Sequence, residues 1–175
     1  MFEFAQTNLQ LYKQMEQRGY STQDRERVAS AYRFLMPMFA GIYRGSEKPF
    51  ITHLVGTAGI LVACSAPAEL VLAGLLHAVY MAGDFGFQPG TRQTGRKRQC
   101  VIDLAGAEAE AIISTYDELA WDPRSVQSYL SNLDELSPQA RSALQLRLAN
   151  TLDDLLAEGL RYCRAEKVDA IASRE

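Results

Sequence analysis

The sequence predicts a single all-α domain, and three observations predict it. Apolar residues recur at intervals of three and four along most of the chain, which is the spacing of a buried helix face. No segment shows the alternation of apolar and polar residues that is typical of a half-buried strand. The length of 175 residues fits one domain, and 47% apolar residues are enough for a full core. We therefore expect one helical bundle over residues 1–175.

Turn and capping residues divide the first part of the chain into two helices. The first is expected over residues 2–17, because Gly19 is a typical helix stop. The second begins at Ser21 or Thr22, whose hydroxyls can cap a helix with an acidic first turn. Pro37 should kink it, since proline removes a backbone donor and clashes one turn back. Its apolar stripe predicts core or dimer contacts through Tyr32, Phe34, Leu35, Met36, Met38 and Phe39.

The middle of the chain predicts two central helices, over residues 50–64 and 67–82. Both are apolar nearly all round, which is typical of helices buried on every side. Pro67 suits the first turn of the second helix, and the short turn before it favours an antiparallel pair. A long loop should follow over residues 84–95, which contain three glycines and Pro89.

The second half of the chain continues as helices. Shorter helices are expected over residues 96–104, 107–119, 125–133 and 161–171. Ser137 and Pro138 open the most periodic segment, as a cap followed by proline at the first helical position. The expected inner face of this long helix consists of Leu144, Leu148, Leu152, Leu155 and Leu156.

Composition argues against several classes of protein. A net charge of −3 gives no global attraction to nucleic acid or to an anionic membrane. The three cysteines form no C-x-x-C pair, which favours reduced thiols in the cytoplasm over a disulfide framework. The N-terminus lacks a signal pattern, and Pro67 divides the most apolar stretch into halves too short to span a bilayer. We therefore expect a cytoplasmic protein with neither nucleic-acid nor membrane partners.

The two histidines are the most informative side chains. His53 lies near the start of one central helix and His77 near the end of the next. In an antiparallel pair these two ends are adjacent, so both imidazoles can face one pocket. Histidine is the usual proton carrier near neutral pH, which predicts acid–base work there. The alternative for each is a core histidine that makes a hydrogen bond inside the bundle.

Polar residues around the histidines complete the candidate site. Asp84 follows His77 by seven residues and returns to the same helix face if the helix persists. The alternative is that Gly83 breaks the helix and the chain folds Asp84 back. On the late helix, Asn150, Asp153 and Asp154 share a face. The candidate catalytic residues are His53, His77, Asp84 and Asp153. The candidate substrate-binding residues are Arg44, Lys48, Asn150 and Tyr80.

Segments around both histidines resemble a known family. Arg44-x-Ser46-x-x-Pro49-Phe50-x-x-His53 and Ala73-Gly74-Leu75-Leu76-His77 are similar to the start of the HD-domain metal-dependent phosphohydrolases. The nearest members are the hydrolase domain of the stringent-response alarmone enzymes and uncharacterised HD-like domains. Residues 147–152 are similar to the family segment that supplies the last metal ligand. The resemblance covers about residues 40–155 and implies an HD-like helical bundle.

The resemblance also implies a divalent metal held by two histidines and two aspartates. The matching positions are occupied by His53, His77, Ala78 and Asn150. Hard ions such as Mg²⁺ prefer the carboxylates that are missing here, whereas imidazoles suit Zn, Fe or Ni. The expected cofactor is therefore either none or an atypical transition metal bound through His53 and His77.

Three functions follow as hypotheses. The first is a small-molecule enzyme on a remodelled HD-like scaffold, which uses both histidines for acid–base work or for an atypical metal. The second is a catalytically silent ligand-binding or interaction module. The third is a phosphohydrolase or an HD-type iron oxygenase with substituted ligands. Missing carboxylates weigh against ordinary HD phosphohydrolysis, because that reaction needs the metal to activate water.

Two partners are expected. A small molecule with an anionic group would be held by Arg44, which the family resemblance also places near a nucleotide base. The second expected partner is another copy of the chain, because HD-like relatives often dimerise. The candidate homodimer contact is the first helix, through Phe2, Phe4, Leu9 and Tyr12.

Overall fold

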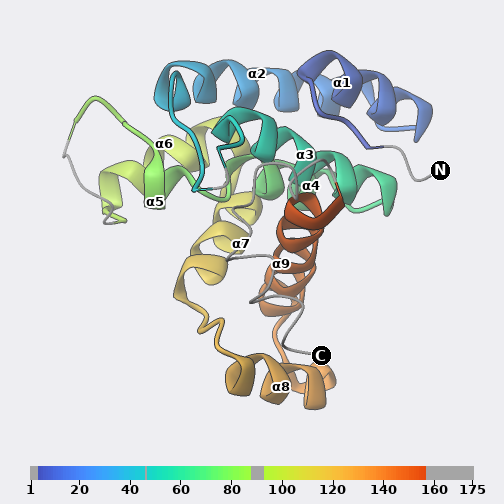
Figure 1. The fold of residues 1–175 in the computed structure, drawn as a ribbon, viewed down its shortest axis with the longest axis vertical. Helices are drawn as coiled ribbons and strands as arrows, with labels where there is room; N and C mark the ends of the chain where they lie inside the picture. The colour runs from blue at the N-terminus through green and yellow to red at the C-terminus, as the bar shows by residue number, and fades with distance from the viewer. Residues whose placement is uncertain (1–3, 46, 88–92, 157–175) are drawn as a thin grey trace.

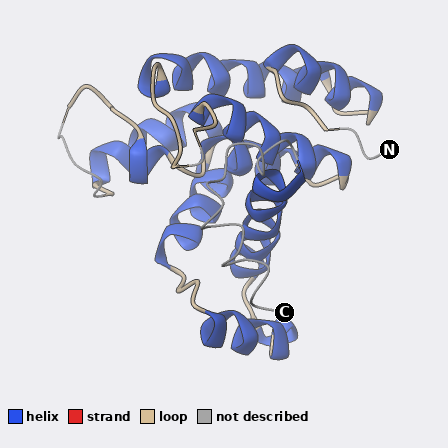
Figure 2. Ribbon diagram, in the orientation of Figure 1, coloured by secondary structure: helices blue, strands red, loops and turns tan. Residues whose placement is uncertain are grey.

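The regular structure of this protein is helical. The computed structural model describes residues 4–45, 47–87 and 93–156 (Figure 1). Those residues include no strand, and one isolated antiparallel bridge pairs Tyr43 with Pro49 (Figure 2). The prediction of an all-α, single-domain bundle is confirmed.

The helices follow the predicted order with shifted bounds. They are α1 (Asn8–Gln17), α2 (Thr22–Phe39), α3 (Phe50–Ala63), α4 (Ala68–Leu76), α5 (Val79–Ala82), α6 (Gly95–Ala105), α7 (Ala107–Glu118), α8 (Pro123–Ser131), the 3₁₀ turn η1 (Leu133–Glu135) and α9 (Pro138–Leu156). The helix predicted over 161–171 lies outside the described residues.

Capping decides where the first two helices begin. Thr7 caps α1, and its hydroxyl accepts from the backbone N–H of Gln10 while the Gln10 side chain bonds back to Thr7. The expected helix over 2–17 is therefore shortened to begin at Asn8. Ser21 caps α2 in the same reciprocal way with Asp24. This helix continues through Pro37 and ends two residues later, at Phe39.

The helix predicted over 67–82 is interrupted at His77. It forms two helices, α4 and α5, with Ala78 between them at φ −103° and ψ 6°. The His77 side chain bonds the carbonyl of Gly74, one of the acceptors that a helix end leaves without a backbone partner. The break therefore places the imidazole at a helix end.

The helices form a packed body with a projecting arm. In Figure 1, α1 and α2 lie along one side of α3 and α4, while α7 runs outward to α8 at the far end and α9 runs back from there to the body. α9 packs against both α3 and α7, so it joins the arm to the body. Every residue from His53 to Val62 and from Leu70 to Leu76 is buried, as the all-round apolar pattern predicts.

The inner face of α9 agrees with the prediction only in part, since Leu152 packs against the core as expected. Its buried residues include Ala143, Leu146, Ala149, Asn150 and Asp153. Leu148, expected inside, is 60% exposed. Small side chains allow α9 to approach α3 and α7 closely, whereas a row of leucines would hold the helices apart. The correction matters because the close face carries Asn150 and Asp153.

Two sequence expectations concern surfaces. Among the described residues, no helix has both the length and the apolar character needed to cross a membrane. In the expected dimer contact, Leu9 is 73% exposed, whereas Phe4 and Tyr12 pack partly against the core. Phe2 lies outside the described residues. In the stripe of α2, the buried residues are Leu35, Met38 and Phe39.

Candidate functional site

A tight loop before α3 presents two cations. The backbone N–H of Arg44 donates to the carbonyl of Lys48 at 3.0 Å, and that of Glu47 donates to Arg44 at 2.8 Å. Glu47 adopts a left-handed conformation with φ 67°, which closes the turn. Arg44 and Lys48 are thereby held at the start of α3, where both reach residues of α9.

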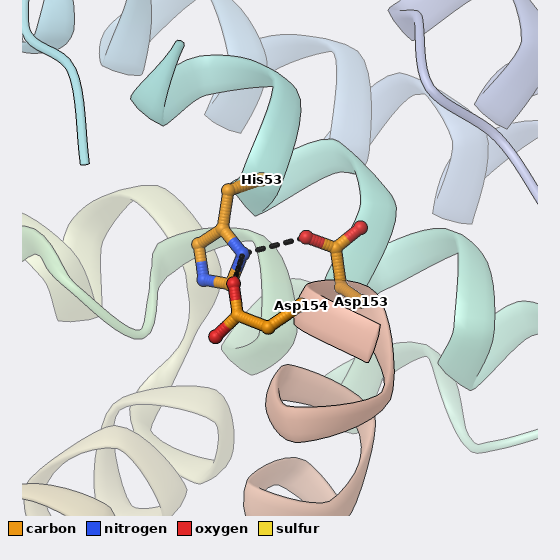
Figure 3. A group of neighbouring side chains, drawn as sticks. All are labelled: His53, Asp153 and Asp154. Carbon is orange, nitrogen blue, oxygen red and sulfur yellow. Dashed lines mark hydrogen bonds and ion pairs between the residues drawn. The ribbon is translucent and has the colours of Figure 1, made fainter. Parts of the chain in front are cut away.

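Lys48, Asp153 and His53 form a buried chain of polar contacts. The Lys48 ammonium donates to both carboxylate oxygens of Asp153 at 2.8 Å. His53 Nδ1 lies 2.7 Å from Asp153 Oδ2, with Asp154 beside it (Figure 3). The carboxylate places the imidazole proton on Nδ1 and leaves Nε2 as an acceptor. The side chains of Lys48, Asp153 and His53 are all buried.

Gly56 makes this arrangement possible. It lies on α3 where the Asp153 side chain crosses from α9, and a Cβ at this position would overlap the carboxylate. Glycine therefore lets the charged end of Asp153 enter between the two helices.

Arg44 lies against the other side of the His53 ring. Its Nη1 donates to His53 Nε2 and lies 3.5 Å from Asn150 Oδ1. Its Nη2 donates to Asp154 Oδ2 at 3.0 Å. The guanidinium also lies 5.8 Å from the centre of the Phe50 ring. One arginine thus contacts three polar side chains at the meeting point of α3 and α9.

His77 lies next to His53, as the sequence predicts. The two ring centres are 5.3 Å apart and the rings are nearly perpendicular, at 79°. His77 Nδ1 donates to the carbonyl of Gly74 at 2.8 Å, which leaves Nε2 as the acceptor. Its opposite neighbour is Tyr116, with ring centres 5.7 Å apart.

The surroundings keep both imidazoles neutral. Burial and the charges of Arg44 and Lys48 hold the pKa of His53 well below its ordinary value. Burial, with smaller contributions from His53 and Arg44, lowers the pKa of His77 to about 3. At neutral pH neither ring is therefore a proton donor through Nε2, and the lone pair of His53 Nε2 is the one that accepts from Arg44.

The two aspartates differ in their partners. Burial raises the pKa of Asp153, and the bonds from Lys48 oppose that rise. Burial also raises the pKa of Asp154, and the charge of Arg44 opposes it. Asp153 is fully enclosed between α3 and α9, whereas Asp154 keeps about a third of its side chain exposed.

A pocket opens beside this cluster. Its volume is about 370 Å³, which falls in the range of small-molecule sites. His77 and Asn150 line it together with two arginines, Arg44 and Arg147. The other lining residues are Tyr43, Gly45, Phe50, Met81, Tyr116, Asp117 and Trp121.

The far wall of the pocket was not predicted from the sequence. Arg147 lies over the Trp121 ring at 5.4 Å, and Trp121 packs on Tyr116 with ring centres 5.2 Å apart. The Tyr116 hydroxyl accepts from Asn150 Nδ2 at 2.6 Å. One feature of the sequence could have indicated Arg147: it lies three residues before Asn150 and so shares its helix face. Tyr116, on α7, and Trp121, in the turn after it, had no such feature, because this segment reaches the pocket only through tertiary packing.

The structure does not bring Asp84 or Tyr80 into the pocket. Asp84 is exposed, and its carboxylate accepts from the backbone N–H of Gly86. The expected helix continuation is absent because α5 ends at Ala82. The Tyr80 hydroxyl instead donates to the buried Glu110, which also accepts two bonds from Arg98. Burial and Glu110 raise the pKa of Tyr80.

The remaining predicted residues meet at the pocket or directly behind it. His77, Arg44 and Asn150 line the pocket. His53, Lys48 and Asp153 lie behind them in the buried chain of contacts, where Asp153 orients His53.

The residues present do not fit a divalent metal as the HD resemblance implies. Ala78 offers no ligand atom, and Asn150 offers an uncharged amide. His53, Asp153 and Asp154 have ligand atoms within 4.8 Å of one another, but Lys48 already binds both oxygens of Asp153. Arg44 contacts His53 Nε2, Asn150 and Asp154, the groups that would face an ion.

Comparison with known proteins adds one match. A domain of unknown function, DUF6817, matches residues 34–120, just under half of the chain. The matched segment runs from α2 to the turn after α7 and contains both histidines, but not α9. No curated protein matches the sequence.

Proposed function

We propose that the chain is a small-molecule enzyme on a remodelled HD-like scaffold. Its pocket binds a molecule that carries an anionic group and a flat ring, and His77 accepts a proton from it. The observation that carries this proposal is the neutral His77 ring lining the same pocket as Arg44 and Arg147.

Charge and shape define the ligand class. Two guanidinium groups line the pocket against one exposed carboxylate, Asp117. Arginine matches the planar geometry of carboxylate and phosphate groups. Trp121 and Tyr116 supply flat apolar surface on which a ring can stack. A planar carboxylate or phosphate ester therefore fits better than an aliphatic or a cationic molecule.

His77 is suited to accept a proton rather than to donate one. Its Nδ1–H is held by the Gly74 carbonyl, so the ligand can meet only the lone pair of Nε2. Positive charge from Arg44 is one cause of its low pKa. Burial is the larger cause, so an anion bound beside Arg44 would offset that charge and raise the basicity of the ring in part.

The HD-like scaffold is supported by where the resembling segments lie. Arg44 to His53, Ala73 to His77 and Arg147 to Leu152 are far apart in the sequence. In the fold, Arg44, His77 and Arg147 line one pocket. Three segments chosen by resemblance therefore converge on one place.

Ligand binding is tested by thermal unfolding with a panel of aromatic carboxylates and nucleoside monophosphates, each beside an uncharged counterpart. We expect only the anionic members to raise the melting temperature. Arg147→Ala should weaken binding by about 10-fold or more, because it removes a charge-assisted bond worth at least about 1.5 kcal/mol. Asp84→Ala is the matched control, since Asp84 lies outside the pocket and should change nothing.

Turnover is then followed by mass spectrometry of the ligands that bind. His77→Gln should lower it by about 100-fold or more while leaving the fold intact, which is the usual contribution of a general base. A panel in which neutral members stabilise the protein as well as anionic ones would contradict the proposed ligand class.

A catalytically silent binding module is the second candidate. The observation that favours it is that Arg44 covers His53 Nε2, so one of the two imidazoles is already bonded. In that case the anionic ligands bind and are recovered unchanged, and His77→Gln alters affinity alone.

A further inference from the structure

We propose that Arg44 is a built-in cation that takes the place of a divalent metal. Its guanidinium occupies the position facing His53, Asn150 and Asp154, and removing it would open a transition-metal site that also includes His77. The inference concerns the pocket of the proposed function, but it rests on the contacts of Arg44 and not on any ligand.

Both histidines are oriented in the way that metal-binding histidines are. His53 donates Nδ1–H to the carboxylate of Asp153, and His77 donates Nδ1–H to the carbonyl of Gly74. Such bonds to the second nitrogen fix the ring and leave Nε2 for an ion. The ligand atoms that lie within 4.8 Å of one another belong to His53, Asp153 and Asp154. The His77 ring, with its centre 5.3 Å from that of His53, is the neighbouring imidazole that can join them.

The position between these groups is occupied by positive charge. Arg44 donates to His53 Nε2 and to Asp154 Oδ2 and lies 3.5 Å from Asn150 Oδ1. An ion in the same place would accept lone pairs from the same atoms. Guanidinium and metal therefore exclude each other sterically as well as electrostatically.

The charge balance supports this exclusion. Two carboxylates, Asp153 and Asp154, face two cations, Lys48 and Arg44. Adding a divalent ion would leave two uncompensated positive charges in a largely buried cluster, which is strongly unfavourable. Removing Arg44 instead leaves Asp154 without its cation, and a divalent ion would then restore an attractive partner.

Co²⁺ is the probe for this inference, because imidazole-rich sites suit such ions and its visible absorption reports coordination by protein ligands. Chelator-treated wild-type protein should show no saturable binding. Arg44→Ala should bind one Co²⁺ per chain, more than about 100-fold more tightly than wild type. Arg44→Met retains the apolar stem beside Phe50 and serves if Arg44→Ala is unstable. Far-UV circular dichroism checks the fold of each variant.

Two further variants locate the ion. Adding His77→Ala to Arg44→Ala should abolish the Co²⁺ absorption. Arg147→Ala, which removes a cation from the opposite wall, should gain no metal. The inference is overturned if wild type binds Co²⁺ through His77, if folded Arg44→Ala and Arg44→Met bind none, or if Arg147→Ala gains the same site. None of these measurements uses the anionic ligand, so the proposed function can fail separately.

Discussion

At the scale of residues, the site depends on a buried ion pair between Lys48 and Asp153. Asp153 is buried with both oxygens bonded to Lys48, and its neighbour His53 depends on it for orientation. A buried charge that loses its partner is far more costly than a surface charge. Stability and site geometry are therefore coupled at Lys48.

We expect Lys48→Met to destabilise the fold by about 3–5 kcal/mol, the usual cost of leaving a buried charge without its partner. Denaturant unfolding measures the change. In Lys48→Met/Asp153→Asn the uncompensated charge is gone and an amide oxygen can still accept from His53. This double variant should be more stable than Lys48→Met alone. If it were less stable, the pair would not be the source of the cost.

His77 should make stability depend on pH. Its pKa is lowered to about 3 in the fold, against 6.5 for the free side chain. Between those values the unfolded histidine binds a proton and the folded one does not, so the free energy of unfolding falls as pH falls below 6.5. The limiting slope is about 1.4 kcal/mol per pH unit for one such group.

The contribution of His77 can be isolated by difference. Asp153 and Asp154 have raised pKa values and act in the opposite direction at acid pH. Denaturant titrations at several pH values between 6.5 and 4.5 therefore give, for wild type and for His77→Gln, the slope of the free energy of unfolding against pH. We expect the variant to have the shallower slope. Equal slopes would mean that His77 gains a proton readily in the fold.

At this scale the sequence predicted which residues meet but not how they bond. The proximity of His53 and His77 followed from two antiparallel helices. The sequence did not predict that Arg44 separates His53 from the pocket. That arrangement depends on the loop that holds Arg44 and on an aspartate from a helix about 100 residues later. Asp84 was misplaced because a helix was extended past the break at His77.

At the scale of elements, Gly56 sets how closely α9 approaches α3. The Asp153 carboxylate lies where a Cβ of Gly56 would be. Gly56→Ala should therefore push α9 outward and cost about 1–3 kcal/mol, as overpacking does. It should also weaken anionic ligand binding, because Asn150 and Arg147 move with α9.

Gly95 provides the matched control. It begins α6, and a Cβ there meets nothing within 4 Å. Gly95→Ala should leave stability unchanged or raise it slightly, since alanine is the better helix former. Thermal unfolding of the two variants tests the contrast. Similar losses in both would show that the Gly56 effect is not due to Asp153.

Helix order was predictable and helix faces were less so. Capping residues and prolines act locally, so the starts of α2 and α9 could be predicted from Ser21, Ser137 and Pro138. The buried face of α9 is chosen by the partners it packs against. The sequence favoured leucines such as Leu148, whereas packing favours small residues beside Leu146.

At the scale of the whole molecule, α9 makes the body and the arm one unit. It packs against α3 in the body and α7 in the arm, and it supplies Asn150 and Asp153 to the site. The matched family segment, residues 34–120, lacks this helix. We therefore predict that the chain unfolds in one cooperative transition and that the site is lost with it.

Trp121 is the single tryptophan and reports on the arm, where it contacts Tyr116 and Arg147. Its fluorescence and the far-UV circular dichroism of all helices should give the same denaturation midpoint. Leu146→Ala, in the buried face of α9, should lower the free energy of unfolding by about 2–5 kcal/mol and move both midpoints together. Leu148 is exposed, so Leu148→Ala should change the free energy of unfolding by less than about 0.5 kcal/mol. An earlier fluorescence transition would show instead that the arm unfolds before the body.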